Sequence, residues 1–178
     1  MIIWLASYPK SGNTWMWFFI KSYFNPPNKK FSLNHDKDDP YLLETFPTQR
    51  RFNELNIKYD DFLDLSKNWI NLQYLINLNN KTNYLKTHNA MCTVNNNKFT
   101  DIKNTKGAIH IVRDPRDVLV SYSSYKNENI NKTLEILLSD NSYEYASFEE
   151  KRYKRSSMGS WSSHYNSWKS YKSQETLL

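Results

Sequence analysis

The sequence predicts an α/β fold with a central parallel sheet, and three observations support this prediction. Short segments at 1–6, 82–86 and 108–112 have the length and residue types of strands. Segments with helical spacing separate them, and strands that are connected through helices pair in parallel. Each predicted strand runs into a polar stretch, "SYPKSGNT", "LKTHN" or "VRDPRD". In such sheets ligands bind beyond the carboxyl ends of the strands, so these three stretches are expected at one rim.

The first third of the chain is predicted to contain a strand, a helix and a long irregular region. Residues 1–6 are almost entirely apolar, as a strand buried on both faces would be. Residues 14–24 are predicted as a helix, because aromatic residues recur at spacings of three and four, and Pro26 ends it. Residues 31–60 show no clear period and are predicted as a loop with short helices. The residues expected near one face of the helix are Trp15, Phe18, Phe19 and Tyr23.

The rest of the chain alternates between predicted helices and strands. The best-defined helix is Pro115–Lys126, because Asp114 is a suitable N-cap and Pro115 fits the first helical position. Residues 128–145 are predicted as a helix that gives way to an irregular segment. The other elements expected are one or two helices over 59–78, strands over 82–86 and 108–112, a loop near 95–106 and a final helix over about 160–172.

Composition and charge favour a single soluble domain over residues 1–178. With 39% hydrophobic residues, the chain can bury a core of its own. Its net charge of +6 suits an anionic ligand, and it also fits a protein that is merely kept soluble. Cys92 is the single cysteine, which excludes an intrachain disulfide and favours a reducing compartment. Since no run is long and apolar enough to span a membrane, we expect a cytoplasmic protein.

The loop between the first strand and the first helix, residues 10–14, has the chemistry of an anion site. Successive backbone N–H groups at a helix N-terminus attract negative charge, and the helix dipole adds to this attraction. Gly12 lets the backbone come close to a ligand, and Lys10 supplies a full positive charge. Ser11 and Thr14 add hydroxyl donors. The order differs from the Walker A pattern, since Lys precedes Gly, and an ordinary turn with a Ser or Thr cap is the alternative.

The other two strand ends carry further candidates for the same site. Arg113 follows the third predicted strand, where its guanidinium suits a phosphate, and Ser121 lies eight residues further on. A surface ion pair between Arg113 and Asp117 is the alternative. His88 follows the second strand and suits a general base, because imidazole titrates close to neutral pH, although a structural histidine is the alternative. No metal site is predicted, since Cys92 stands alone and the histidines are dispersed.

Four segments together resemble the sulfotransferases that use 3′-phosphoadenosine 5′-phosphosulfate (PAPS). "YPKSGNTW" is similar to the family's 5′-phosphosulfate loop, with Asn13 in place of a Thr, and "IVRDPRDVLVSYSSY" is similar to its 3′-phosphate motif. "LKTHNA" resembles the segment that carries the family's catalytic His, and "GSWSSHYNSW" resembles a later G-x-W-x-x-H-x-x-S-W stretch. The four occur in the family's order over residues 3–168.

The resemblance implies a P-loop-like three-layer fold and a sulfuryl transfer reaction. PAPS would be the co-substrate and the acceptor a hydroxyl or amine of a small molecule, with no metal, nucleic acid or membrane involved. By the resemblance, His88 takes the acceptor's proton, Lys10 stabilises the leaving group and Lys86, on the same strand face, helps to hold the sulfuryl oxygens. The residues implied to bind the co-substrate are Lys10, Ser11, Gly12, Asn13, Thr14, Trp15, Arg113 and Ser121.

The resemblance does not extend to the family's last elements. The family continues with another strand, a "YEDL"-like segment and an "RKGxxGDW" loop that closes over the nucleotide, whereas this chain ends at Leu178. We therefore expect a sulfotransferase-like domain that is incomplete at its C-terminus. A non-catalytic nucleotide-binding remnant and a P-loop kinase-like phosphotransferase are the rival functions. Residues 25–80 are expected to supply much of the acceptor pocket, and four aromatic residues there suit either its walls or the core: Phe31, Tyr41, Phe46 and Phe52.

Overall fold

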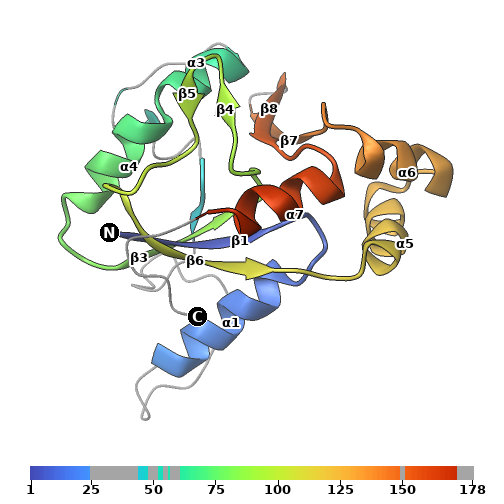
Figure 1. Cartoon of the computed structure of the whole chain (residues 1–178), viewed down its shortest axis with the longest axis horizontal. Helices are drawn as coiled ribbons and strands as arrows, with labels where there is room; N and C mark the ends of the chain where they lie inside the picture. The colour runs from blue at the N-terminus through green and yellow to red at the C-terminus, as the bar shows by residue number, and fades with distance from the viewer. Residues whose placement is uncertain (25–43, 48–51, 54–55, 57–60, 149–150, 172–178) are drawn as a thin grey trace.

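A parallel sheet lies at the centre of the computed structural model, with its strands in the order β2-β3-β1-β6 (Figure 1). β1 (Ile2–Ser7) pairs in parallel with both β3 (Asn83–Thr87) and β6 (Thr105–Ile111). β2 (Glu44–Thr45) joins β3, also in parallel. The predicted α/β fold with a central parallel sheet is confirmed. The structure describes residues 1–24, 44–47, 52–53, 56, 61–148 and 151–171.

β1 occupies the middle of the sheet because it is apolar on both faces. Ile2, Trp4 and Ala6 alternate onto one face and belong to the larger core cluster. Leu5 lies on the opposite face and is also fully buried. The indole Nε1 of Trp4 donates to the hydroxyl of Thr105 at 2.9 Å, so this large ring is buried without an unpaired polar atom.

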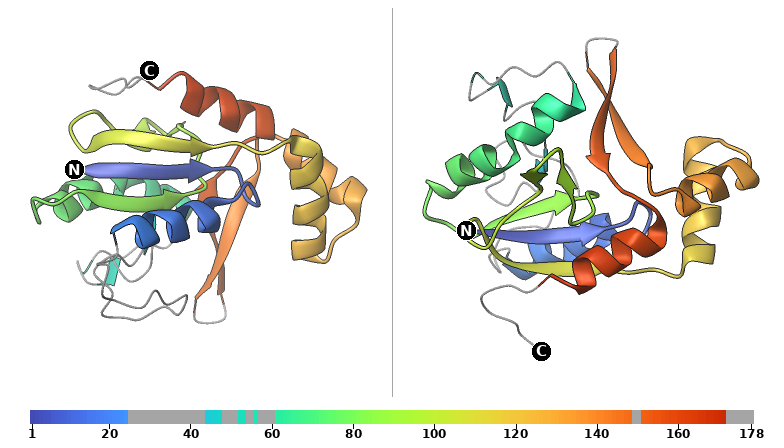
Figure 2. Two further views of the ribbon diagram at one scale, coloured as in Figure 1. Left: turned by 90° about the horizontal axis from the view of Figure 1, so that it is seen from below. Right: turned by 45° about the horizontal axis from the view of Figure 1, so that its top comes forward.

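Helices cover the two faces of the sheet and produce three layers (Figure 1). α3 (Phe62–Lys67) and α4 (Trp69–Asn77) lie on the side of the larger core cluster, to which α7 (Trp161–Lys169) contributes Trp168. α1 (Asn13–Phe24) lies on the other side. α5 (Pro115–Lys126) and α6 (Ile130–Leu138) lie beyond the carboxyl ends of the strands (Figure 2).

The face that α1 turns to the sheet is not the aromatic face predicted from its spacing. Trp15, Phe19 and Tyr23 are exposed, whereas Trp17 and Lys21 are buried. The start of the helix explains the difference. The side-chain amide of Asn13 donates to the Leu5 carbonyl and to the Ser7 hydroxyl, both at 2.9 Å. These bonds turn Asn13 to the sheet, and Trp17 and Lys21 follow it at intervals of one helical turn.

α5 begins and ends where the sequence predicted. The carboxylate of Asp114 caps it by accepting from the backbone N–H of Arg116 at 2.9 Å, and Asn127 ends it in the left-handed conformation. Residues on the inner face of α5 belong to the second core cluster. In this cluster the loop after β1 packs against α5, α6 and the segment before α7. The buried members of this cluster are Tyr8, Val118, Tyr122, Leu137 and Met158.

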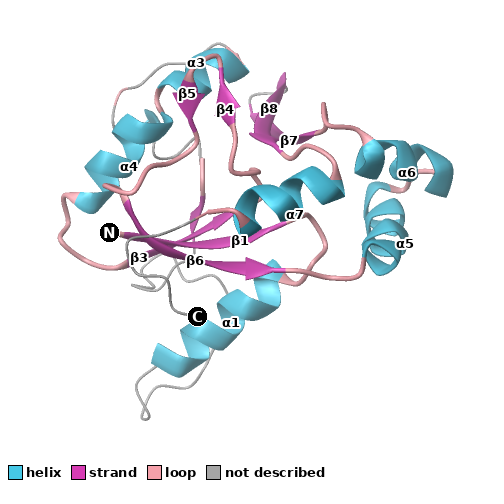
Figure 3. Cartoon of the chain, viewed as in Figure 1, coloured by secondary structure: helices cyan, strands magenta, loops and turns pink. Residues whose placement is uncertain are grey.

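Two antiparallel hairpins were not predicted (Figure 3). β4 (Thr93–Val94), just before the loop predicted near 95–106, pairs with β5 (Asn97–Lys98) within that loop. β7 (Tyr143–Phe148) pairs with β8 (Lys151–Ser157), and the prediction that residues 128–145 end in an irregular segment was wrong at the start of β7. β8, KRYKRSS, is almost entirely polar, so it lacks the apolar alternation that usually indicates a strand.

Candidate active site

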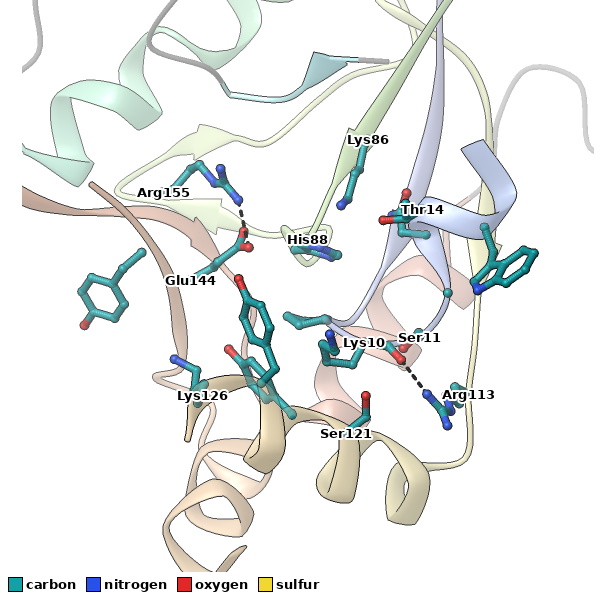
Figure 4. A pocket seen from close by; sticks show the side chains of 17 residues that line it. Lys10, Ser11, Thr14, Lys86, His88, Arg113, Ser121, Lys126, Glu144 and Arg155 are labelled. Carbon is teal, nitrogen blue, oxygen red and sulfur yellow. Dashed lines mark hydrogen bonds and ion pairs between the residues drawn. The ribbon is translucent and has the colours of Figure 1, made fainter. Parts of the chain in front are cut away.

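A cleft of about 810 Å³ lies beyond the carboxyl ends of β1, β3 and β6 (Figure 4). This is the rim at which the three polar stretches were expected. Its lining comes from the loop after β1, the end of β3, the residue after β6, α5, and the hairpin β7–β8. All the site residues named from the sequence line this one cleft: Lys10, Ser11, Gly12, Asn13, Thr14, Trp15, Lys86, His88, Arg113 and Ser121.

The described lining of the cleft is strongly basic. It contains five cationic side chains, and Glu144 is its one carboxylate. A concave surface with one sign of charge concentrates ligands of the opposite sign. The volume is also within the range of small-molecule sites, roughly 300–1,000 Å³. The cationic residues are Lys10, Lys86, Arg113, Lys126 and Arg155.

The loop after β1 turns sharply so that the first turn of α1 borders the cleft. Lys10 and Gly12 both have positive φ, 68° and 106°. The N–H of Ser11 donates to the Tyr8 carbonyl at 3.3 Å, and the helical bonds begin with Met16 N–H to the Gly12 carbonyl at 3.1 Å. N–H groups in the first turn of a helix have no partner within the helix, so they remain available to an anion at the cleft.

The hydroxyl of Ser11 is available to form a hydrogen bond with a ligand at this loop. Its hydroxyl is buried, yet it has no hydrogen-bond partner among the described residues. A buried hydroxyl without a partner costs free energy, about 1–3 kcal/mol, unless a ligand or water completes it. An anion bound to the loop would accept this hydrogen bond.

Asn13 contributes to the site differently from its neighbours. Its side chain is 4% exposed, and its amide nitrogen is occupied by Leu5 and Ser7 in β1. Its side-chain oxygen is buried and has no hydrogen-bond partner among the described residues. The Asn side chain therefore fixes the end of β1 against the start of α1.

Lys10 and Arg113 connect the two predicted phosphate motifs. Arg113 donates from Nη1 to the Lys10 carbonyl at 3.2 Å, which joins the end of β6 to the loop after β1. The ammonium of Lys10 lies 4.3 Å from the ring centroid of Tyr125 on α5. Arg113 also forms the alternative ion pair with Asp117, at 3.8 Å and with both side chains exposed. An ion pair of this kind contributes little, and the guanidinium retains further donors for a ligand.

The hydrogen bond of His88 fixes which ring nitrogen can act as a base. Nδ1 lies 2.7 Å from the Ser7 carbonyl, and the side chain is buried. Because a carbonyl only accepts, Nδ1 carries the hydrogen of the neutral ring and Nε2 has the free electron pair. Burial lowers the pKa of His88, and Lys86 and Arg155 lower it further against the opposing effects of Glu144 and the Ser7 carbonyl. The ring is therefore neutral near pH 7.

Lys86 lies on β3 and lines the cleft together with His88, as expected from their spacing. Burial lowers the pKa of Lys86, Arg155 and Lys10 lower it further, and Glu144 works in the opposite direction.

Three cleft residues, Glu144, Tyr145 and Arg155, were missed because they lie on the unpredicted hairpin. Glu144 on β7 and Arg155 on β8 form an ion pair, with Oε1 and Nη2 2.8 Å apart. Burial acts to raise the pKa of Glu144, but His88, Arg155 and Lys86 outweigh it and the pKa is lowered. The alternation of Tyr143 and Tyr145 in "YEYASF" was the one signal that could have indicated β7.

Other residues singled out in the sequence lie away from the cleft. His110 is partly buried in β6, and its ring lies 5.8 Å from that of the buried His164. Burial lowers the pKa of His164 to about 3, and His110 and His88 add to this effect. Phe46 and Phe52 belong to the larger core cluster rather than to a pocket wall. Phe31 and Tyr41 lie outside the described residues.

The described segments contain neither a cluster of metal ligands nor a membrane-spanning helix. No three His, Cys, Asp or Glu side chains in these segments come together as they would around a metal ion. None of their helices has both the length and the apolar character needed to cross a membrane.

Residues 2–178 match the family model described as "Sulfotransferase domain". The match includes the loop after β1, the ends of β3 and β6, and the hairpin β7–β8, and so it includes the whole lining of the cleft. No curated protein matches the chain.

Proposed function

Because the chain belongs to the sulfotransferase domain family, we propose that it transfers a sulfuryl group from PAPS to a hydroxyl or amine of a small-molecule acceptor. One observation carries the proposal beyond the family match. A single cleft combines an anion-binding loop with a buried histidine whose Nε2 is free to take a proton. Anion binding alone would not need that histidine.

The residues present fit a nucleotide with phosphate groups at both ends of its ribose. The backbone of residues 11–14 and the hydroxyls of Ser11 and Thr14 would hold the 5′-phosphosulfate, and Lys10 would supply charge beside it. Arg113 and Ser121 would hold the 3′-phosphate. Trp15, which is 82% exposed and borders the cleft, would offer its ring to the adenine.

In the proposed reaction, the acceptor oxygen or nitrogen attacks the sulfur and forms the new bond. The bond between sulfur and the bridging phosphate oxygen breaks, and its electron pair leaves with adenosine 3′,5′-bisphosphate. His88 accepts the acceptor's proton on Nε2 as the bond forms. Lys10 stabilises the charge on the leaving oxygen, and Lys86 helps to hold the sulfuryl oxygens. Positioning and charge stabilisation carry such in-line transfers.

Nucleotide preference tests the proposal directly. We expect adenosine 3′,5′-bisphosphate to bind more tightly than 5′-AMP, and the Arg113→Ala variant to lose most of that preference. A charge-assisted hydrogen bond contributes about 1.5–3 kcal/mol, so the preference should fall by roughly tenfold or more. Arg116→Ala is the matched control, since Arg116 is an exposed arginine in the first turn of α5, pairs with Asp114 at 2.6 Å and does not line the cleft.

Isothermal calorimetry would measure the six affinities, those of the parent and the two variants for each nucleotide. Equal binding of the two nucleotides by the parent chain would contradict the 3′-phosphate assignment. A preference for ATP with Mg²⁺ over PAPS would favour a phosphotransferase instead. Sulfuryl transfer itself would be measured with radiolabelled PAPS and a panel of phenols, alcohols and amines.

A further inference from the structure

We propose that Glu144 is a positioning residue for His88, and that its carboxylate stabilises the imidazolium that forms when His88 takes the acceptor's proton. This inference rests on the proposed function, because it assigns a role within that same reaction. In Figure 4 the Glu144 carboxylate lies between the Arg155 guanidinium and the His88 ring. Glu144 is also the one carboxylate in the described lining of the cleft.

A β-bulge in β8 places Arg155 beside Glu144. Glu144 is opposite Ser156, whereas the next residue, Tyr145, is opposite Lys154, so Arg155 is an extra residue in β8. A bulge turns a side chain away from the regular alternation of a strand. Here Arg155 reaches the Glu144 carboxylate at 2.8 Å, and the Ser156 hydroxyl donates to its other oxygen at 3.4 Å. Both oxygens of the carboxylate therefore have donors.

The residue after His88 fixes the hairpin relative to the histidine. The side-chain oxygen of Asn89 accepts from the backbone N–H of Ser157 at 2.8 Å. The Ala90 N–H donates to the Ser157 carbonyl, also at 2.8 Å, and the indole of Trp168 donates to the Asn89 carbonyl at 2.9 Å. Asn89 is fully buried. The C-terminal end of β8 and the residues after His88 are thus hydrogen-bonded to each other. Because Glu144 pairs with β8, Glu144 and His88 keep their relative position when no acceptor is bound.

The charges around His88 explain why it needs a carboxylate. Lys86 from β3 and Arg155 from β8 both disfavour a protonated ring, and burial disfavours it further. From β1, the Ser7 carbonyl favours protonation by accepting the Nδ1 hydrogen, and on α7 the neutral His164 is close enough to interact. Glu144 is the one full negative charge among these groups. Without it, a proton on His88 would be surrounded by cations in a site that is partly closed to water.

Glu144→Gln tests the role, because it removes the charge and keeps the shape. We expect the turnover number at saturating PAPS to fall about tenfold, since a weaker base accepts the proton less readily. The acid limb of the pH profile should move to lower pH by about one unit, because His88 loses an anionic neighbour. Adenosine 3′,5′-bisphosphate should bind no more weakly than to the parent, since no nucleotide contact is removed. Glu144→Asp, which restores the charge, should recover most of the rate.

Glu128→Gln is the matched control. Glu128 is also paired with a cation, Lys132 at 2.8 Å, but it does not line the cleft, and its variant should have parental kinetics. Thermal unfolding of each variant shows whether it is folded, and Glu144→Asp carries the comparison if Glu144→Gln is not. A turnover number and pH profile of Glu144→Gln equal to those of Glu128→Gln would overturn the inference.

An NMR titration of the His88 ring separates this inference from the proposed function, because it needs no turnover. We expect His88 in the parent chain to bind its proton at higher pH than in Glu144→Gln. If the parent chain transfers no sulfuryl group but this difference is observed, the proposed function fails and the coupling of Glu144 to His88 stands. Identical titration of His88 in the two proteins would overturn the coupling, whatever the activity.

Discussion

Gly12→Ala tests the geometry of the anion loop, and its effect can be worked out from the structure. Gly12 has φ of +106°, a conformation that L-residues rarely adopt. The space is sufficient, because an added Cβ would lie 3.9 Å from Cγ2 of Ile111, an ordinary contact. The cost is therefore backbone strain alone, about 1–3 kcal/mol.

The matched control is Gly107→Ala in β6. No atom lies within 4 Å of the Cβ that alanine would add there, and the backbone has no positive φ. Alanine is favoured over glycine in a strand by roughly 0.5–1 kcal/mol, so this variant should be as stable as the parent or more stable. The two Gly→Ala changes should thus move stability in opposite directions.

Urea unfolding and calorimetry would measure the two consequences. With m of about 1–3 kcal/mol per M, the strain in Gly12→Ala lowers the unfolding midpoint by roughly 1 M. If the loop instead relaxes to negative φ, the midpoint is preserved, but the N–H groups at the cleft move and adenosine 3′,5′-bisphosphate binds more weakly. A Gly12→Ala variant that matches the parent in both midpoint and affinity would refute this account of the loop.

Two further predictions concern histidines. His88→Ala should lower the transfer rate by a factor of about 10²–10⁴ and change the affinity for adenosine 3′,5′-bisphosphate by less than tenfold. Rapid-quench kinetics would measure the rate and calorimetry the affinity. Unchanged turnover would remove His88 from the mechanism. Since the pKa of His164 is lowered from 6.5 to about 3 by burial, the parent should lose stability as pH falls from 6.5 towards 3, because the unfolded chain takes up the proton first. His164→Gln should flatten this part of the curve of unfolding free energy against pH, and an equally steep curve would contradict the assignment.

The elements that the sequence predicted well are those whose signals are local. The bounds of α5 follow from Asp114 and Pro115, residues that act within one helical turn. The buried β1 follows from its own apolar residues. The position of the cleft was also predictable, because the carboxyl ends of parallel strands lie at one edge of the sheet.

The parts that were missed depend on contacts between distant residues. The face of α1 is set by bonds from Asn13 back to β1, which spacing within the helix cannot reveal. The hairpin β7–β8 is held by its own ladder and by Asn89, far away in the sequence. The roles of Glu144 and Arg155 depend on that hairpin, so neither could be placed at the cleft from the sequence.

The position of β1 has a consequence for synthesis on the ribosome. β1 is made before its two neighbours in the sheet, which begin at Asn83 and Thr105. Its apolar segment therefore stays unpaired until the segments that form β3 and β6 have emerged. During that interval "IIWLA" is an exposed hydrophobic segment of the kind that chaperones bind and that aggregates when left uncovered. The strand that organises the finished sheet thus needs protection while the protein is being translated.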